Sequence, residues 1–136
     1  MVDGVSVLAH GGYMAAGSIE PQFFAQLLAG LGFAPDEVPG QFESGRYDEI
    51  RAAFADRFAG RTRDEWTAIF ADTDACVTPV LSWTEAAEDE HLLARRTLVD
   101  IDGVQQAAPA PRFSRTPAGR PGQPPQHTAS LADIDG

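Results

Sequence analysis

The best-placed carboxylate in the sequence is Glu20, which stands in the stretch Gly-Ser-Ile-Glu-Pro at residues 17–21. Apolar residues precede this stretch and a helical pattern follows it, so Glu20 lies at a predicted strand-to-helix junction. A carboxylate there can accept an N–H from a catalytic imidazole and orient it, or it can bind a ligand group. The structural alternative, which the local sequence alone favours, is a stabilising interaction with the positive end of the helix dipole.

Imidazole and thiol side chains are few and do not form a recognisable catalytic set. Metal binding requires converging ligands with i, i+4 spacing or paired motifs, which the three histidines lack: His10, His91 and His127. Glu88 precedes His91 by three residues, but carboxylate-bridged metal centres need this pair twice, so a solvated helix face is expected. The single cysteine, Cys76, lies in an apolar run, which predicts a buried structural thiol rather than a nucleophile.

Loops that hold nucleophilic serines, phosphates or dinucleotides are absent from the sequence. It contains no Gly-x-Ser-x-Gly elbow, no P-loop and no Gly-x-Gly-x-x-Gly motif. Arginines can bind phosphates through bidentate hydrogen bonds, although scattered ones more often form surface ion pairs. The candidates here are Arg95, Arg96, Arg112 and Arg115. Neither a metal nor a resident cofactor is expected, and the residues alone do not make a self-sufficient catalytic site.

The composition is that of an acidic, ordinarily hydrophobic chain of one domain's length. The 136 residues carry 20 acidic and 10 basic side chains, for a net charge of −10, and 43% of them are hydrophobic. The negative charge disfavours nucleic acid as a partner. A single cysteine excludes an internal disulfide. Without a long apolar run or a signal peptide, no membrane association is expected, and a cytoplasmic location is predicted.

A hairpin and a helix are predicted at the start of the chain. Residues 5–9 and 13–16 are apolar runs, and the Gly-Gly pair between them is typical of a β-hairpin. Pro21 suits the first position of a helix, where its missing N–H costs nothing. Gly30 and Gly32 predict where this helix stops.

A Pro/Gly-rich loop over residues 33–45 separates this helix from two more. The second helix is predicted from about 46 to 59, and the third begins at a Thr-x-x-Glu capping box over residues 62–65. A short strand is predicted over residues 76–81, in which Pro79 indicates an edge position or a strand end.

The remaining residues predict another capping box, a second hairpin and an arm. Ser-x-x-Glu at residues 82–85 begins a short helical stretch, and residues 97–105 predict a hairpin around Asp-Gly. Six of the ten prolines lie between Pro109 and Pro125, which predicts an extended arm or a disordered tail. The predicted fold is α+β, with short hairpins flanking three or four helices. It comprises a small domain over residues 1–107 and a Pro-rich arm over residues 108–136.

Three blocks of sequence stand in a characteristic order. They are GYMAAGSIEPQFF at 12–24 with LLAGLG at 27–32, then DEW at 64–66 with Phe70 and DACVTPVL at 74–81, and finally APAPRFSRTP at 108–117. Together they resemble the C-terminal small domain of the family III CoA-transferases, and within that family the α-methylacyl-CoA racemase branch. The resemblance covers about residues 5–118, and it is the order of the three blocks that makes it specific.

The resemblance implies a fold and a chemistry that extend beyond this sequence. Members of the family are longer chains in which a large N-terminal α/β domain binds CoA and carries the main catalytic residues. In racemases these are a His and an Asp on opposite sides of carbon 2 of the acyl chain. One removes the α-proton and the other returns it to the opposite face, through an enolate. The transferase relatives instead use an Asp that forms a covalent anhydride with the acyl group.

The resemblance also implies roles for two residues of this sequence. Family dimers are interlocked rings, in which the small domain of one subunit closes the active site of the other. By position in the first block, Glu20 points into that site and supports the catalytic His, and Ile19 lines the acyl pocket. The CoA thioester is then the substrate, not a cofactor.

The sequence departs from the family in lacking residues that match the large domain with its catalytic His and Asp. A smaller departure is His10-Gly11-Gly12, where an Asp-Gly-Lys-like turn is expected, and it affects only the hairpin. The chain is therefore expected to be inactive alone and to act on acyl-CoA with a large domain or partner subunit, in a homo- or hetero-oligomer. Three hypotheses follow: the catalytic half of a racemase-like enzyme, a transferase small domain, or a non-catalytic remnant or interaction module.

Overall fold

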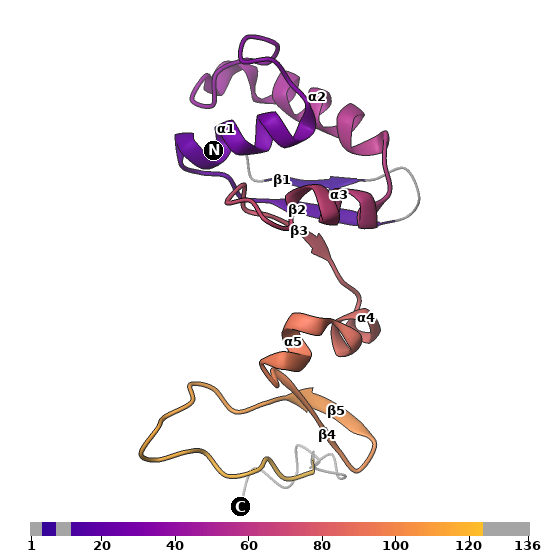
Figure 1. The fold of residues 1–136 in the computed structure, drawn as a ribbon, viewed down its shortest axis with the longest axis vertical. Helices are drawn as coiled ribbons and strands as arrows, with labels where there is room; N and C mark the ends of the chain where they lie inside the picture. Colours follow the sequence, from indigo (N-terminus) through magenta and orange to yellow (C-terminus); the bar gives the residue numbers. More distant parts are fainter. Residues whose placement is uncertain (1–3, 8–11, 124–136) are drawn as a thin grey trace, which may run out of the picture. The chain divides into compact units, whose positions relative to one another are not determined.

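The structure, a computed structural model, describes residues 4–7 and 12–123, and the chain divides into two units between Leu81 and Ser82 (Figure 1). The first unit contains β1 (Gly4–Val7), β2 (Tyr13–Ala16), α1 (Pro21–Leu31), the 3₁₀ helix η1 (Ser44–Arg46), α2 (Tyr47–Ala59), α3 (Arg63–Phe70) and β3 (Val77–Val80). The second contains α4 (Trp83–Glu88), α5 (Glu90–Ala94), β4 (Leu98–Ile101) and β5 (Val104–Ala107). Helices and antiparallel strands together confirm the predicted α+β class. The described residues form five α-helices where three or four were predicted, because a separate short helix, α5, follows α4. The helices in these ranges are too short or too polar to span a lipid bilayer.

The strands of the first unit form an antiparallel sheet in the order β1-β2-β3. β1 and β2 pair as the predicted hairpin, and the connecting residues 8–11 lie outside the described ranges. The sequence did not predict that β3 joins this hairpin, where it places Pro79 opposite Met14. Within the described sheet β3 is an edge strand, so the prediction for Pro79 is confirmed, because an edge position tolerates its missing N–H.

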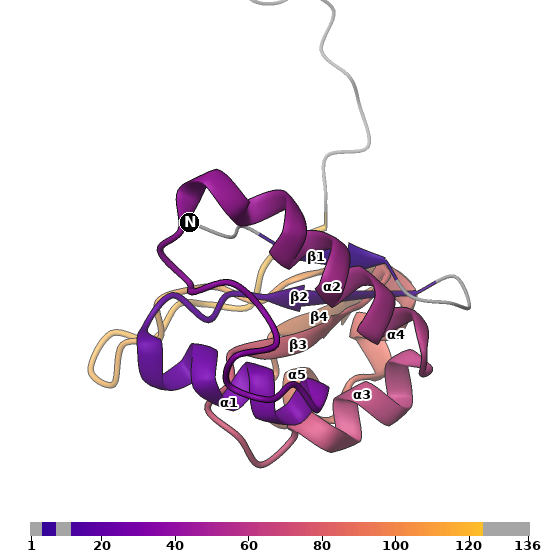
Figure 2. The same cartoon turned by 90° about the horizontal axis from the view of Figure 1, so that it is seen from above.

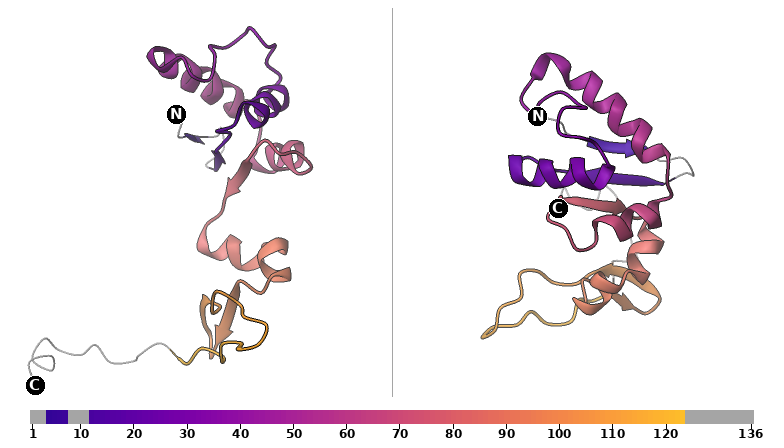
Figure 3. Two further views of the ribbon diagram at one scale, coloured as in Figure 1. Left: turned by 90° about the vertical axis from the view of Figure 1, so that its left-hand side faces the viewer. Right: turned by 45° about the horizontal axis from the view of Figure 1, so that its top comes forward.

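α1, α2 and α3 lie on one face of this sheet (Figures 2 and 3). The alternation of side chains along the strands agrees with that arrangement. Met14 and Val77 are buried in the core, whereas Tyr13 and Val80, which oppose each other in the register, are exposed. The sheet therefore has one face packed on helices and one face that this unit leaves open.

Aromatic rings link the three helices across the core. The ring centroids of Phe24 on α1 and Phe54 on α2 lie 6.1 Å apart. Trp66 on α3 meets Phe58 on α2 edge-on at 5.3 Å and stacks on Phe70 at 6.0 Å. The buried indole N–H of Trp66 donates to the carbonyl of Phe58 at 2.9 Å, so burial leaves this polar group satisfied.

Both predicted capping boxes are present. At the start of α3, Thr62 N donates to Glu65 Oε2 at 2.8 Å, and Glu65 N donates to Thr62 Oγ1 at 3.3 Å. At the start of α4, Ser82 N donates to Glu85 Oε2 at 2.7 Å and Glu85 N donates to Ser82 Oγ at 3.3 Å. These reciprocal bonds satisfy backbone donors that a helix N-terminus otherwise leaves without partners.

The two glycines predicted to stop α1 have different roles. Gly32 ends the helix in the left-handed conformation, with φ +74°, and its N–H returns to the carbonyls of the last turn. Gly30 lies inside the helix, so the prediction that it belongs to the stop is wrong. A Cβ at position 30 would stand 2.3 Å from Cε1 of Phe70, so the glycine is required by close packing between α1 and α3.

The second unit is built from two short helices and a hairpin. Asp89 separates α4 from α5, and its Oδ1 caps α5 by accepting from Leu92 N at 2.9 Å. β4 and β5 form the predicted hairpin around Asp102 and Gly103, which have φ values of +54° and +84°. Residues 108–123 contain neither helix nor strand, and the rest of the Pro-rich segment lies outside the described ranges.

The packing of Gly30 generates a stability prediction. We expect Gly30→Ala to destabilise the chain by about 1–3 kcal/mol, because the added methyl group overlaps the Phe70 ring, which is itself fixed in the core. Urea unfolding followed by tryptophan fluorescence measures the change. Gly45→Ala is the matched control, since a Cβ there meets nothing within 4 Å. Equal stability of the Gly30→Ala variant and the parent chain would contradict the packing argument.

Candidate functional site

Residues 17–20 connect β2 to α1, and hydrogen bonds to the segment before β3 anchor their first half. Gly17 N donates to the carbonyl of Cys76 at 2.9 Å, next to the last β2–β3 pair. Ser18 Oγ donates to the carbonyl of Ala75. The junction therefore begins at the end of the central strand β2 and is held there by both backbone and side chain.

A third contact reaches the junction from the loop between α1 and η1. Gln41 Nε2 donates to the carbonyl of Ser18 at 2.8 Å and to the carbonyl of Ile19 at 2.5 Å. Both N–H groups of the amide are thus donated, one to each of two consecutive carbonyls. Nothing in the local sequence around Gln41 indicated this contact, which spans more than 20 residues of chain.

Glu20 occupies the N-cap position of α1, where the sequence places it. Its backbone is extended, with φ −79° and ψ 142°, and its carbonyl accepts from Phe23 N at 3.0 Å and Phe24 N at 2.9 Å. Its carboxylate makes no capping hydrogen bond and is exposed. The neighbouring Ile19 side chain is 53% exposed. Both side chains are thus available to a molecule or chain outside this unit.

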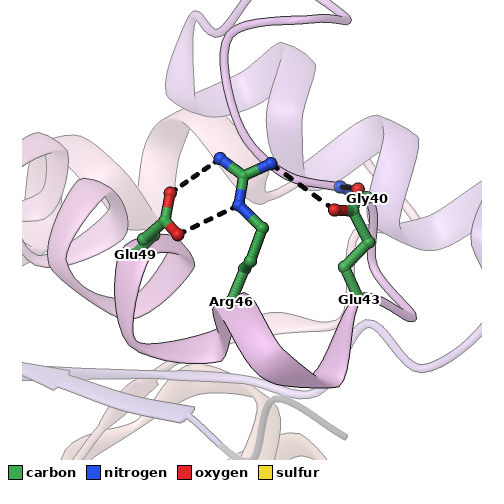
Figure 4. A network of polar contacts seen from close by, with 4 residues as sticks. All are labelled: Gly40, Glu43, Arg46 and Glu49. Atoms are coloured by element: carbon green, nitrogen blue, oxygen red, sulfur yellow. Dashed lines mark hydrogen bonds and ion pairs between the residues drawn. The ribbon is translucent and has the colours of Figure 1, made fainter.

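Hydrogen bonds and ion pairs of charged side chains hold the loop that carries Gln41 (Figure 4). Gly40 N donates to Glu43 Oε1 at 2.7 Å, and Arg46 Nη1 lies 3.4 Å from Glu43 Oε2. Arg46 also donates to both oxygens of Glu49, through Nε at 2.9 Å and Nη2 at 2.7 Å. Hydrogen bonding to Arg46 lowers the pKa of Glu49, and hydrogen bonding to Glu49 raises the pKa of Arg46.

The beginning of the same loop has its own ion pair. Glu37 Oε2 accepts from Ala34 N at 3.0 Å, and Glu37 Oε1 accepts from Arg57 Nη2 on α2 at 2.6 Å. The backbone bond from Ala34, followed by the contact with Arg57, lowers the pKa of Glu37. The Arg57 guanidinium also lies 4.5 Å from the ring centroid of Phe33. The loop is therefore fixed to α2 near both of its ends.

An open groove with a volume of about 1100 Å³ runs between α1, α2 and this loop. Its walls are largely apolar and include Phe24, Leu28, Phe33 and Phe42, with Gln41 among the polar lining residues. Glu20 does not line the groove, so the candidate carboxylate and this hollow are separate features.

Cys76 is exposed, so the prediction of a buried structural thiol is wrong. Its neighbours Ala75 and Val77 are buried, and Cys76 precedes the first residue of β3. The residue also has φ +53°, in the left-handed region. The apolar run in the sequence therefore contains an exposed residue between two buried ones and is not buried continuously.

The Glu88–His91 pair does not share a helix. Glu88 is the last residue of α4, Asp89 interrupts the helix, and His91 lies on α5. Both side chains are exposed, in agreement with the predicted solvated surface. Across the described residues, no group of three or more His, Cys, Asp or Glu side chains is arranged to hold a metal ion. His10 and His127 lie outside these residues.

The four arginines considered as phosphate ligands are all exposed and all belong to the second unit. Arg112 donates from Nη2 to the carbonyl of Arg95, which uses part of its guanidinium in a contact with the backbone. Arg96 has φ +49° at the turn that leads into β4. The Ile19–Glu20 junction belongs to the first unit, so these arginines and the candidate carboxylate are features of different units.

Comparison with known proteins identifies the family. The sequence profile of CoA-transferase family III matches residues 7–129. The chain belongs to CoA-transferase family III. The resemblance carried by the three sequence blocks is thereby confirmed, and it extends through the candidate junction and both structural units.

Curated relatives within this family include racemases. Alpha-methylacyl-CoA racemase of Mus musculus is 48% identical over 111 residues, which are 81% of this chain and 29% of that protein. The Homo sapiens protein of the same name is 42% identical over the same shares. A CaiB/baiF CoA-transferase family protein of Caenorhabditis elegans is 30% identical over 74% of this chain and 28% of its own length. The chain thus spans less than a third of these relatives.

Solved structures share the fold. A crystal structure of Rv3272 from Mycobacterium tuberculosis matches 85% of this chain and 33% of its own, with a TM-score of 0.68 and 16% sequence identity. A crystal structure of a point mutant of Rv3272 matches 97% of this chain and 38% of its own, with a TM-score of 0.69. At this identity the likeness establishes the fold alone.

The exposure of Cys76 predicts ready chemical modification of the folded chain. We expect a disulfide reagent such as Ellman's reagent to titrate one thiol per chain in native buffer, at a rate within about tenfold of the urea-unfolded chain. The Cys76→Ser variant should give no signal. A thiol that reacts only after denaturant is added would contradict the exposed position.

The ion pairs of the Gln41 loop predict how stability depends on pH. The pKa of Glu49 is lowered by folding from its usual value of 4.5, so its stabilisation is complete above that value and is lost as the pH falls through the folded pKa. We expect Glu49→Gln to lower the melting temperature slightly at pH 7, since the pair is exposed, and to have a smaller effect at pH 3. Asp56→Asn, a change at an exposed position of the same helix, is the control. An equal loss at both pH values would contradict an electrostatic origin.

Proposed function

We propose that this chain acts as the small domain of an α-methylacyl-CoA racemase, which inverts carbon 2 of 2-methylacyl-CoA thioesters. The observation that carries the proposal is the 48% identity to the mouse racemase over 81% of the chain. The identity to the worm CaiB/baiF CoA-transferase family protein, 30% over 74% of the chain, is lower. This difference favours racemase chemistry over CoA transfer.

The proposed reaction needs two proton-transfer groups and a means of holding an enolate. A base removes the proton from carbon 2, and the electron pair of the broken C–H bond delocalises onto the thioester oxygen. A conjugate acid on the other face then returns a proton to carbon 2, which leaves the opposite configuration. Since the α-proton of a thioester is weakly acidic, the base must be oriented and the enolate must meet positioned donors.

In this proposal Glu20 supports the base and does not itself abstract the proton. Its exposed carboxylate, at a fixed N-cap position, is suited to accept the N–H of a catalytic imidazole supplied by a large CoA-binding domain. That hydrogen bond sets the tautomer and the direction of the imidazole. The exposed Ile19 would line the acyl pocket, where burial against the acyl chain is favourable by about 1.5–3 kcal/mol.

The proposal therefore includes partners. The large domain would come from the same enzyme or from a partner subunit, and the working assembly would be a homo- or hetero-oligomer. The exposed pair Tyr13 and Val80 on the open face of the sheet supports an assembly in which this face is covered.

Exchange of the α-proton tests the proposed function. We expect the chain alone, incubated with a 2-methylacyl-CoA in heavy water, to give no loss of the carbon-2 proton signal above the blank. A chimaera, in which this chain replaces the 111-residue matching segment of the mouse racemase, should catalyse the exchange. Glu20→Gln in the chimaera should slow exchange by about 10²-fold, because the imidazole loses its orienting carboxylate.

The controls separate the alternatives. Glu88→Gln changes an exposed carboxylate at the end of α4 and should leave exchange unaffected. Exchange by the chain alone at enzymatic rates would mean that it holds a complete acid–base pair, against the supporting role of Glu20. A folded chimaera without exchange would contradict the proposed function, and CoA transfer without exchange would favour the transferase hypothesis.

A further inference from the structure

We propose that Gln41 is a positioning residue that fixes the direction of Ile19 and Glu20, an inference that rests on the proposed function of these two residues. The chemistry of the contact fixes its orientation. Because two carbonyls are the acceptors, the amide must present its NH₂ end to the junction, and its bonds to Ser18 and Ile19 use both protons.

Two consecutive carbonyls are an effective place to hold a junction. The carbonyl of Ser18 belongs to the rigid peptide plane that leads to Ile19, and the carbonyl of Ile19 belongs to the plane that leads to Glu20. These planes meet at the Cα of Ile19, and the second plane meets the first peptide of α1 at the Cα of Glu20. Fixing both carbonyls therefore fixes the backbone from which both exposed side chains project.

The junction's other hydrogen bonds described above involve atoms other than the carbonyls of Ser18 and Ile19. The bonds from Gly17 N and Ser18 Oγ hold the part nearest the sheet. The bonds that the Glu20 carbonyl accepts belong to the first turn of α1. Between them, the carbonyls of Ser18 and Ile19 are held by the Gln41 side chain.

Gln41 is itself held in place by its neighbours. Gly40 N donates to Glu43 Oε1, Glu43 N donates to the Gly40 carbonyl at 3.0 Å, and Arg46 bridges Glu43 to Glu49 (Figure 4). The side chains of Glu43, Arg46 and Glu49 thus fix the turn from which the Gln41 amide reaches the junction.

Hydrogen exchange of the 136-residue chain tests the contact directly. Gln41→Met keeps the length and volume of the side chain and removes both donors. We expect the Ile19 amide, which donates to the Gly17 carbonyl at 2.9 Å, to exchange about tenfold faster in this variant. Gln106→Met is the matched control, because it removes the bond from a half-buried glutamine to the carbonyl of Gly122, both in the second unit.

Kinetics of the racemase chimaera test the positioning role. We expect Gln41→Met to lower kcat for α-proton exchange about tenfold with a smaller change in KM, and Gln106→Met to leave both unchanged. The decisive measurement is the double variant. If Gln41 acts through Glu20, Gln41→Met should slow exchange no further in a chain that already carries Glu20→Gln.

The outcomes separate this inference from the proposed function. An unchanged Ile19 exchange rate in Gln41→Met overturns the inference, whatever the chimaera does. Losses of kcat that multiply in the double variant also overturn it, because Gln41 would then act independently of Glu20. If the junction loosens but Glu20→Gln leaves turnover unaffected, the contact is real and the proposed function of Glu20 fails.

Discussion

The first unit depends on how the backbone passes from the sheet to α1. At such a junction the strand ladder has ended and the helix has not begun, so carbonyl groups have no regular partner. Here Gln41 supplies the partner for Ser18 and Ile19 from a distant loop. That contact links the loop over residues 33–45, which ion pairs hold near both of its ends, to the candidate site.

The charged side chains around this loop act through geometry. An ion pair at an exposed site contributes little free energy, because solvent screens it and two long side chains lose freedom. A guanidinium nevertheless has several donors in a fixed plane, so Arg46 can hold Glu43 and Glu49 at once, and Arg57 can hold Glu37 while it covers the Phe33 ring. All ten bases of this chain are arginines, and these two use more than one donor or face. Their contribution is the shape of the loop.

Local signals in the sequence were sufficient for most elements. Pro21, the two capping boxes and the Asp-Gly turn each act through neighbours within four residues, so their structures follow from spacing alone. The position of Glu20 at the N-cap belongs to the same class. The order of the three sequence blocks identified the family, because it reflects the whole domain and not one element.

The features that the sequence did not predict all depend on distant contacts. Gly30 resembles a helix stop until the ring of Phe70 is placed beside it. Cys76 resembles a core residue until β3 is paired with β2 and its neighbours take the inner face. Gln41 resembles any loop glutamine until its amide meets the junction. The candidate site was predicted only in part for the same reason. Ile19 and Glu20 were identified from the sequence, whereas the Gln41 amide that holds their backbone was not.

A rigid backbone with exposed side chains is an arrangement suited to completing a site formed elsewhere. An isoleucine that is 53% exposed beside an exposed carboxylate contributes little to the core of its own unit. Their precise presentation matters only if another surface meets them, since catalytic orientation is sensitive to displacements of about an ångström. The fixed junction is therefore consistent with the proposed function, in which this unit supplies geometry and a large domain supplies the proton-transfer groups.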